Sequence, residues 1–278
     1  MSREGGASAR FDVARFAELL RARRDEQHGA PAWGEPLTYG AETGSTNDDA
    51  LAAARLGAAS GSVFLAEHQS VGRGRRGRRW IAESGQSLLL SVLLRPAPSP
   101  AGSGPPQTGP LTLAIGLGVR AALAPYSGEA LSVKWPNDVL AGRRKLAGIL
   151  CESQLSGGRV DAVVIGIGIN VGRQSFPPEL AGDATSLADL SGRAHSREQL
   201  LLDVLTEVER RVLECERMGL ELLLAEFRAH DALRDRQVFV SGARELAGVA
   251  RGVDDQGQLL LETEGVTVVV NSGTVRWA

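Results

Sequence analysis

Residues 72–80 of the chain read Gly-Arg-Gly-Arg-Arg-Gly-Arg-Arg-Trp, which places five arginines and three glycines in nine positions. The segment carries a charge of +5 in a protein whose formal net charge is −2, so the rest of the chain sums to −7. Charges packed this densely repel one another, and glycine has no side chain that could anchor the loop. Arginine forks and closely approaching backbone N–H groups suit phosphate oxygens. We therefore expect a mobile loop that becomes ordered around an anionic ligand, in the first interpretation a nucleotide.

The segments on either side of this loop exclude two common nucleotide-binding motifs. Apolar runs predict a strand over 61–68 that enters the loop and a strand over 86–95 that leaves it. The dinucleotide fingerprint Gly-x-Gly-x-x-Gly instead opens a helix, so a Rossmann fold is not expected. No Gly-x-x-x-x-Gly-Lys-Ser/Thr segment is present, which excludes a P-loop. A nucleic-acid-binding patch stays open as an alternative, although no aromatic residues are interleaved among the arginines to stack bases.

Length and composition limit the remaining classes of protein and of site that the chain could form. A chain of 278 residues can bury a full core and hold one large domain or two unequal ones. Cys151 and Cys215 are the only cysteines, so no disulfide framework or cysteine metal site is predicted. The first residues show no apolar signal region, and no run of about 18 apolar residues occurs. We expect a cytoplasmic protein without a membrane segment, and the four scattered histidines predict no metal ligation.

The order of the apolar patterns predicts a mixed α/β domain followed by a small β domain. Helices are expected from Phe11 to about Arg24 and over 46–55, 111–125, 196–218 and 220–230. Ser45 is expected to cap the helix over 46–55. Further strands are expected over 37–42, 131–135, 145–153 and 160–171. Five short strands predict a barrel: 237–240, 246–252, 258–262, 266–270 and 274–277. The predicted boundaries are 1–36 for a helix and linker, 37–234 for the main domain and 235–278 for the barrel, with a surface insertion at 96–110.

Three further motifs carry polar groups to the ends of these elements. Residues 134–138 read Lys-Trp-Pro-Asn-Asp, and a strand–turn–strand of this length places Asp138 and Lys145 at neighbouring strand ends. The alternative for this pair is a surface ion pair worth at most about 1 kcal/mol. The glycines in residues 166–171, Gly-Ile-Gly-Ile-Asn-Val, indicate that a ligand or backbone approaches the strand closely. Residues 44–47, Gly-Ser-Thr-Asn, place hydroxyls and an amide at a helix start, where they suit a neutral polar head group.

Taken in this order and spacing, the four motifs resemble those of biotin protein ligases, and the resemblance covers roughly residues 37–278. It implies a mixed sheet flanked by helices, the fold shared with class II aminoacyl-tRNA synthetases, and an SH3-like C-terminal barrel. It also implies a two-step reaction. Biotin and Mg-ATP form biotinyl-5′-AMP and pyrophosphate, and biotin then passes to a specific lysine of the biotin carboxyl carrier domain of an acetyl-CoA (acyl-CoA) carboxylase.

The resemblance also implies roles for individual residues. The residues implied to bind biotin are Ser45, Thr46, Asn47, Gln69, Arg73, Gly74, Arg75, Lys145 and Gly148. Those implied to bind ATP are Arg75, Arg78, Trp80, Lys134, Asn137, Asn170 and Arg251, the last reaching in from the barrel. Arg75 and Lys145 would neutralise the charge of the adenylation step, and Asp138 is the candidate to orient or deprotonate the acceptor lysine. Mg²⁺ is expected to arrive with ATP, without a site built from protein groups alone.

Two features distinguish the chain from related repressors and from related enzymes. Some members of the family carry an N-terminal winged-helix domain and repress transcription, whereas the stretch before Gly44 holds one predicted helix and a Pro/Gly linker. We therefore expect no DNA binding. Lipoate ligases and octanoyl transferases share the catalytic fold, but their pocket motifs differ from the loop at 72–80. Release of pyrophosphate with biotin or with lipoate discriminates these enzymes, and the sequence leaves the oligomeric state and the carrier protein open.

Overall fold

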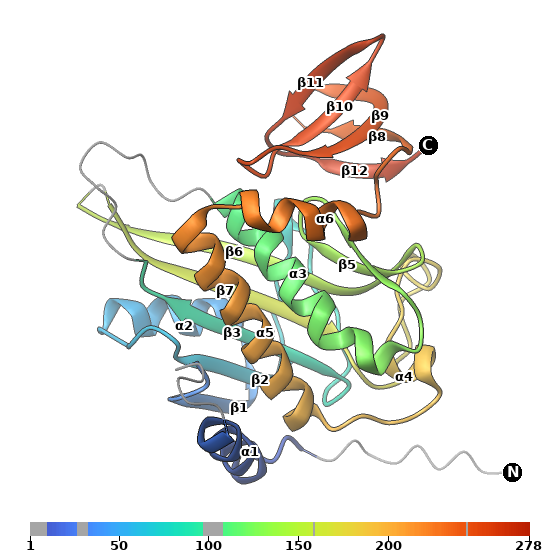
Figure 1. The fold of residues 1–278 in the computed structure, drawn as a ribbon. Helices are drawn as coiled ribbons and strands as arrows, with labels where there is room; N and C mark the ends of the chain where they lie inside the picture. Colours follow the sequence, from blue (N-terminus) through green and yellow to red (C-terminus); the bar gives the residue numbers. More distant parts are fainter. Residues whose placement is uncertain (1–9, 27–32, 97–107, 158, 243) are drawn as a thin grey trace, which may run out of the picture.

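The computed structural model describes residues 10–26, 33–96, 108–157, 159–242 and 244–278. Most of the expected linker over 28–36 and of the expected insertion over 96–110 lies outside these ranges. Within them a large sheet with its helices forms one part of the molecule, and a small sheet sits at one end of it (Figure 1). No helix in these ranges is long and apolar enough to cross a bilayer.

The large sheet has seven strands in the order β1-β2-β3-β7-β6-β5-β4. Only β1 and β2 pair in parallel, and the other neighbours are antiparallel. The strands are β1 Leu37–Thr43, β2 Val63–Gln69, β3 Ser87–Leu94, β4 Leu131–Lys134, β5 Asp138–Ala141, β6 Arg144–Ser156 and β7 Arg159–Asn170. All eight residues of β3 are buried, which explains why six of them are apolar.

Helices cover both faces of this sheet (Figure 1). Side chains of α3 and α5 form the main core with one face, and α2 packs on the other face against Phe64 and Leu93. The helices are α1 Val13–Glu26, α2 Thr46–Arg55, α3 Thr108–Ser127, α4 Leu187–Ser191, α5 Arg197–Met218 and α6 Leu224–His230. Two single 3-10 turns, Arg75–Gly77 and Glu221–Leu223, complete the set in the described ranges.

Several element boundaries differ from those predicted. The helix α3 begins at Thr108 instead of 111, because Pro110 falls in its first turn, where a backbone N–H has no helical partner to lose. The strand predicted over 131–135 ends at Lys134, and the four-residue strand β5 that follows it was not predicted. The short helix α4 was not predicted either; Ser186 caps it by accepting a hydrogen bond from the Asp189 N–H.

The expected small β domain is a five-stranded antiparallel sheet in the order β11-β10-β9-β8-β12. Its strands are β8 Gln237–Ser241, β9 Glu245–Val253, β10 Leu259–Thr263, β11 Val266–Val270 and β12 Thr274–Trp277. The Trp135 indole, at the end of β4, donates a hydrogen bond to the Gly257 carbonyl at 2.9 Å. Trp135 also shares an apolar cluster with Phe227 of α6 and with the small sheet. This packing holds β12 beside the end of the large sheet where the polar motifs meet.

Candidate active site

A cavity of 610 Å³ opens between the loop at 72–80, the ends of β5–β7 and the strand β12. It brings together almost all the residues that the sequence predicts for the site. Those lining it are Ser45, Thr46, Asn47, Gln69, Arg73, Gly74, Arg75, Arg78, Trp80, Lys134, Asn137, Asp138, Lys145, Gly148 and Asn170. Segments separated by more than a hundred positions thus form one site.

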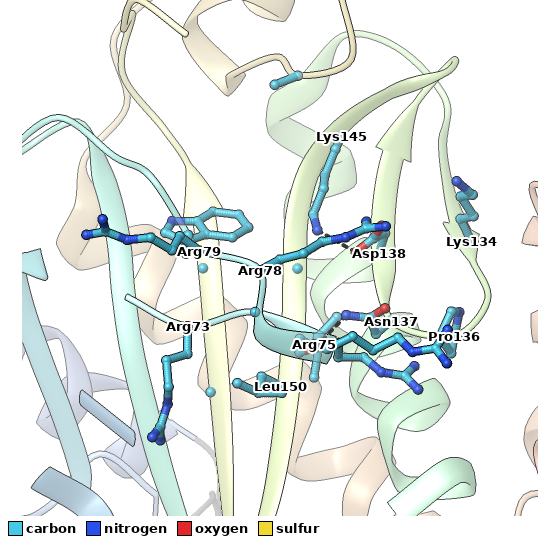
Figure 2. Close-up of a pocket in the computed structure, with 18 of the residues that line it drawn as sticks. Arg73, Arg75, Arg78, Arg79, Lys134, Pro136, Asn137, Asp138, Lys145 and Leu150 are labelled. Atoms are coloured by element: carbon cyan, nitrogen blue, oxygen red, sulfur yellow. Dashed lines mark hydrogen bonds and ion pairs between the residues drawn. The ribbon is translucent and has the colours of Figure 1, made fainter. Parts of the chain in front are cut away.

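The loop at residues 72–80, called the arginine loop from here on, is compact and is closed by backbone hydrogen bonds. The Gly74 N–H donates to the Arg78 carbonyl at 2.7 Å, and the Trp80 N–H donates to the Gly72 carbonyl at 3.0 Å. Arg76, at the tip, has a φ of 57°, in the left-handed region. Figure 2 shows Arg75 and Arg78 directed toward Asn137 and Asp138, while Arg73 points to the opposite side. The expected ordering of this loop on ligand binding stays a prediction.

At one end of the cavity, neutral hydroxyl and amide side chains form a chain of hydrogen bonds that ends at the carboxylate of Glu152. Both the N–H and the hydroxyl of Thr46 donate to Gln69 Oε1, at 2.8 and 3.1 Å. The Ser91 hydroxyl lies 2.8 Å from Thr46 Oγ1 and donates to Asn47 Oδ1 at 2.6 Å. The Asn47 amide in turn donates to Glu152 Oε2 at 2.6 Å. A pocket end built from such fixed donors and acceptors suits an uncharged polar head group.

Two members of this chain, Ser91 and Glu152, were not predicted as site residues. Glu152 Oε2 also accepts a hydrogen bond from Arg73 at 2.8 Å, so it connects the arginine loop to the polar end. Arg73 makes a second ion pair, with Asp48, at 2.8 Å. The signal for Ser91 was present in the sequence, since it is a hydroxyl within a continuous apolar strand, where a buried polar group needs partners.

Ser45 corrects one expectation about this end. It occupies the position before α2 with an extended backbone, but its side chain makes no capping hydrogen bond. Its carbonyl oxygen accepts from the Asp48 and Asp49 N–H groups, as the backbone geometry of a helix start requires. The side chain lines the cavity instead. The Ser45 hydroxyl is therefore not used for capping.

The centre of the cavity holds the pair Asp138 and Lys145. The Lys145 amino group lies 2.6 Å from Asp138 Oδ1, an ion pair drawn in Figure 2. The predicted placement at neighbouring strand ends is wrong, because the hairpin of β5 and β6 pairs Asp138 with Gly148 and Leu140 with Lys145. The two side chains still meet, since the long Lys145 side chain reaches from beside the turn to Asp138. The same amino group lies 5.4 Å from the centroid of the Trp80 ring. A cation and a carboxylate thus stand together at the point where the loop meets the sheet.

Glycines in β6 and β7 make room for three side chains that line the cavity. A Cβ added to Gly168 would lie 2.6 Å from the Trp80 ring, and one added to Gly148 would lie 2.9 Å from the Lys145 amino group. A Cβ on Gly166 would lie 2.3 Å from Asn47 Oδ1. Groups do approach residues 166–171 closely, but they are side chains of the same protein and not the predicted ligand or backbone.

The cavity is strongly positive. Among the described residues, its lining includes nine cationic side chains and two carboxylates, Asp138 and Asp183. Burial lowers the pKa of Arg75, with the nearby charge of Asp138 opposing the shift. Burial likewise lowers the pKa of Lys134, again against Asp138, while Lys145 and Arg78 lower it further. The cationic side chains of the lining are partly removed from water, and they outnumber the carboxylates. Such a cavity suits a ligand with several negative charges.

The two asparagines predicted for the nucleotide line the cavity, but their amides are engaged. The Asn137 side-chain amide donates to the Ile149 carbonyl at 2.8 Å. The Asn170 amide donates to the Thr185 carbonyl at 3.0 Å, and its oxygen accepts from Gln174 at 3.0 Å. In this structure both side chains fix the backbone around the cavity.

Arg251 is the one predicted residue that the structure does not bring to the cavity. Its guanidinium lies 2.6 Å from Asp235 Oδ1 and 2.8 Å from Glu262 Oε2, and these carboxylates hold it outside the lining. The small sheet reaches the cavity through β12 instead. Arg78 donates to the Thr274 hydroxyl at 3.4 Å, and Arg76 donates to the Ser241 carbonyl at 2.6 Å. Both contacts tie the arginine loop directly to the C-terminal sheet.

The cavity offers few groups to a metal ion. In the part of the chain that the structure describes, no three His, Cys, Asp or Glu side chains cluster as metal ligands. One of the two lining carboxylates, Asp138, is already paired with Lys145. This donor set fits a cation that takes most of its oxygen ligands from a bound nucleotide.

Family comparisons define the class of protein. Residues 39–170 match the model of the Biotin/lipoate A/B protein ligase family, and residues 236–276 match that of the Biotin protein ligase C terminal domain. Both matched segments contribute to the cavity. The class is therefore that of ligases for biotin or lipoate, and the C-terminal match favours biotin within it.

Individual relatives narrow this class. The chain is 40% identical over 261 residues to the biotin--[acetyl-CoA-carboxylase] ligase of Mycobacterium tuberculosis, covering 92% of this chain and 94% of the relative. It is 34% identical to the bifunctional ligase/repressor BirA of Bacillus subtilis, covering 86% of this chain and 73% of that one. The structure of the Aquifex aeolicus biotin protein ligase in complex with biotin and ATP matches with a TM-score of 0.77 at 27% identity, over 88% of this chain and 100% of that chain. The chain belongs to the biotin protein ligase family.

Proposed function

We propose that the protein attaches biotin to a lysine of a biotin carboxyl carrier domain of an acyl-CoA carboxylase, in two steps driven by ATP. The observation that carries the proposal is the cavity itself, which joins a neutral hydrogen-bonding end to an arginine loop that faces the Lys145–Asp138 pair. Biotin has an uncharged ureido head and a carboxylate tail, and ATP adds several negative charges. The two ends of the cavity match these two chemistries.

In the first step a biotin carboxylate oxygen attacks the α-phosphorus of ATP. A new O–P bond forms, the bond to the β-phosphate bridge breaks, and pyrophosphate leaves. Two anions must approach each other for this attack, so cations beside them lower the barrier. Arg75 and Lys145 are the candidates, since both line the cavity next to Asp138. The ureido head would lie against Ser45, Thr46, Asn47 and Gln69 at the neutral end.

Mg²⁺ belongs to this proposal as a companion of ATP. When bound with the nucleotide it would neutralise part of the phosphate charge. Asp138 and Asp183 are the carboxylates of the cavity lining, so the protein's share of its ligands is small and the phosphates supply most of them. Removal of Mg²⁺ with EDTA is expected to abolish adenylate formation.

In the second step the acceptor lysine attacks the carbonyl carbon of the adenylate. A C–N bond forms, the C–O bond to AMP breaks, and the amine gives up a proton. Deprotonating a lysine with a reference pKa of about 10.4 costs about 4 kcal/mol at roughly pH 7.4. A carboxylate beside the reacting carbon lowers that cost by orienting the amine or accepting its proton. Asp138 is our candidate for this carboxylate, because it lines the cavity and lies 2.6 Å from the Lys145 amino group.

The experiment for the whole reaction is biotin transfer to a purified carrier domain, followed by intact-mass analysis. The proposal predicts one added biotin per carrier when ATP and Mg²⁺ are present, and none when the acceptor lysine is replaced by arginine. Labelling with lipoate under the same conditions would move the function to the related lipoate ligases. No labelling with either acid would contradict the proposal.

Two further expectations accompany this function. We propose a cytoplasmic location, supported by the use of ATP and by two cysteines that are both free. We also expect no operator binding. Four of the relatives are named as bifunctional ligases and repressors, and the matches cover 63–73% of their length. A specific gel shift on a biotin-operon promoter would contradict the second expectation.

A further inference from the structure

Trp277, the last residue of β12, gathers three cationic side chains around its ring. The Lys134 amino group lies 5.3 Å from the ring centroid, the Arg143 guanidinium 5.2 Å and the Arg236 guanidinium 5.9 Å. These distances are within the range of cation–π attraction. Trp277 itself is half-buried and lines the cavity together with Lys134 and Arg143.

The three cations come from unrelated parts of the chain. Lys134 ends β4, Arg143 lies in the turn between β5 and β6, and Arg236 precedes β8 of the C-terminal sheet. Within the described ranges, none of the three forms an ion pair with a carboxylate of the protein, whereas Lys145 and Arg73 each do. Like charges brought this close repel one another, and the ring offsets only part of that repulsion. Three cations gathered in this way suit an anion with more than one negative charge.

The position of the cluster indicates which anion this is. In Figure 2, Lys134 lies on the far side of Asp138 from Arg73, so the Lys145–Asp138 pair separates the two. In the proposed reaction the biotin carboxylate reacts beside Lys145, and the ureido head of biotin lies at the neutral end. The nucleotide then occupies the other end of the cavity. The groups that leave in the first step then face Lys134, Arg143 and Trp277.

We propose that Trp277 is a positioning residue, which holds Lys134 and Arg143 around the β- and γ-phosphates of the nucleotide and around the departing pyrophosphate. The inference rests on the proposed function, since pyrophosphate is the product of its first step. It gives the C-terminal sheet a defined part in that step. Because Trp277 acts through the two cations, its loss weakens nucleotide binding without removing a reacting group.

Three variants separate cation–π positioning from simple packing. Trp277 also packs against the apolar cluster of the C-terminal sheet, so Trp277→Ala risks loosening that sheet. Trp277→Leu keeps apolar bulk without an aromatic face, and Trp277→Phe keeps the face. Phe239→Ala is the matched control, because Phe239 is 53% exposed on β8 of the same sheet and does not line the cavity.

The measurements are the KM values for ATP and biotin in pyrophosphate release, product inhibition by pyrophosphate, and transfer from preformed biotinyl-5′-AMP. In Trp277→Leu, the ATP KM and the pyrophosphate inhibition constant are expected to rise roughly three- to thirtyfold, as lost cation–π contacts imply. The biotin KM and the transfer from adenylate are expected to change less than about twofold, because neither involves pyrophosphate. Trp277→Phe is expected to restore most of the loss.

The possible outcomes distinguish this inference from the proposed function. If the unaltered protein releases no pyrophosphate with biotin, the proposed function itself is wrong. If it does, but Trp277→Leu leaves the ATP KM unchanged, the positioning role is wrong. Equal losses for ATP, biotin and adenylate transfer would assign Trp277 a purely structural part and overturn the inference, as would a loss of the same size in Phe239→Ala.

Discussion

At the scale of single residues, the site is shaped as much by glycines, which have no side chain, as by charged residues. Gly148, Gly166 and Gly168 leave the space that Lys145, Asn47 and Trp80 fill. The contacts that an added Cβ would make with them are shorter than van der Waals distances, so these side chains could not lie where they do beside any other residue type. The glycines of β6 and β7 therefore help to shape the candidate site.

Gly168→Ala tests this statement. The new methyl group would stand 2.6 Å from the Trp80 ring and displace it, and such overpacking costs about 1–3 kcal/mol. We expect the ATP KM to rise by roughly tenfold or more, measured in pyrophosphate release. Gly182→Ala is the control, because a Cβ there meets nothing within 4 Å. Equal ATP KM values in the two variants would show that Trp80 does not depend on the gap at Gly168.

Asp138→Asn tests the role of the carboxylate in the second step. The amide keeps the shape of the side chain but cannot accept a proton from the acceptor lysine. Transfer from preformed biotinyl-5′-AMP is expected to slow by roughly a hundredfold, as the loss of a general base implies. Asp183→Asn, at the other carboxylate of the cavity lining, is expected to have a much smaller effect. Unchanged transfer in Asp138→Asn would remove Asp138 from the mechanism.

At the scale of elements, the arginine loop connects three parts of the molecule. Arg73 pairs with Asp48 of α2 and Glu152 of β6, and Arg76 and Arg78 contact Ser241 and Thr274 of the C-terminal sheet. These anchors are few and mostly exposed, and the loop's own charges repel one another. An anionic ligand bound to these arginines would offset their repulsion and give the loop further contacts.

Limited proteolysis with trypsin tests this coupling, because Arg76, Arg78 and Arg79 are exposed cleavage sites. We expect rapid cleavage within 73–79 in the free protein and at least tenfold slower cleavage with biotin plus ATP, since an ordered loop must open before it is cut. Biotin alone and ATP alone serve as controls for a ligand that fills only one end of the cavity. The same cleavage rate in all samples would refute the disorder-to-order prediction.

Most elements could be predicted from the sequence, and the exceptions have physical causes. The strand β5 has only four residues and follows Pro136, so no apolar alternation marks it. Ser91 and Glu152 join the site through contacts with Asn47 and Arg73, which lie far away in sequence. The position of Arg251 depends on Asp235 and Glu262, which no local pattern connects. Charge pattern and glycine spacing predicted the site, while side-chain partners required the folded chain.

At the scale of the whole molecule, a buried ion pair fastens the N-terminal segment to the catalytic sheet. Glu67 and Arg197 are almost fully buried, with 2.6 Å between Glu67 Oε2 and the guanidinium. Glu67 Oε1 also accepts hydrogen bonds from the Phe11 N–H and the Tyr39 hydroxyl, both at 2.7 Å. Burial alone would raise the pKa of Glu67, but the hydrogen bonds from Arg197, Phe11 and Tyr39 outweigh it and lower the pKa. This carboxylate joins the segment that precedes α1 to β1, β2 and α5.

Glu67→Gln is expected to lower the free energy of unfolding at pH 7 by about 3–5 kcal/mol, because it removes the negative charge from a buried ion pair. Since folding lowers the pKa of Glu67, its ionisation stabilises the protein above the unfolded pKa of about 4.3 and this contribution is lost as the pH falls through the folded value. The difference between the two proteins, measured by urea unfolding, should therefore shrink in acid. Glu18→Gln, in an exposed pair with Arg15, should cost less than about 1 kcal/mol. A similar small cost for Glu67→Gln would contradict this account.

The central claim is that the cavity forms an acyl adenylate from biotin. The most direct test is pyrophosphate release from Mg-ATP by the purified protein, with biotin, with lipoate or with neither acid. We predict release that depends on biotin and is absent with lipoate and without an acid. Release with lipoate alone, or no release with either acid, would contradict the claim.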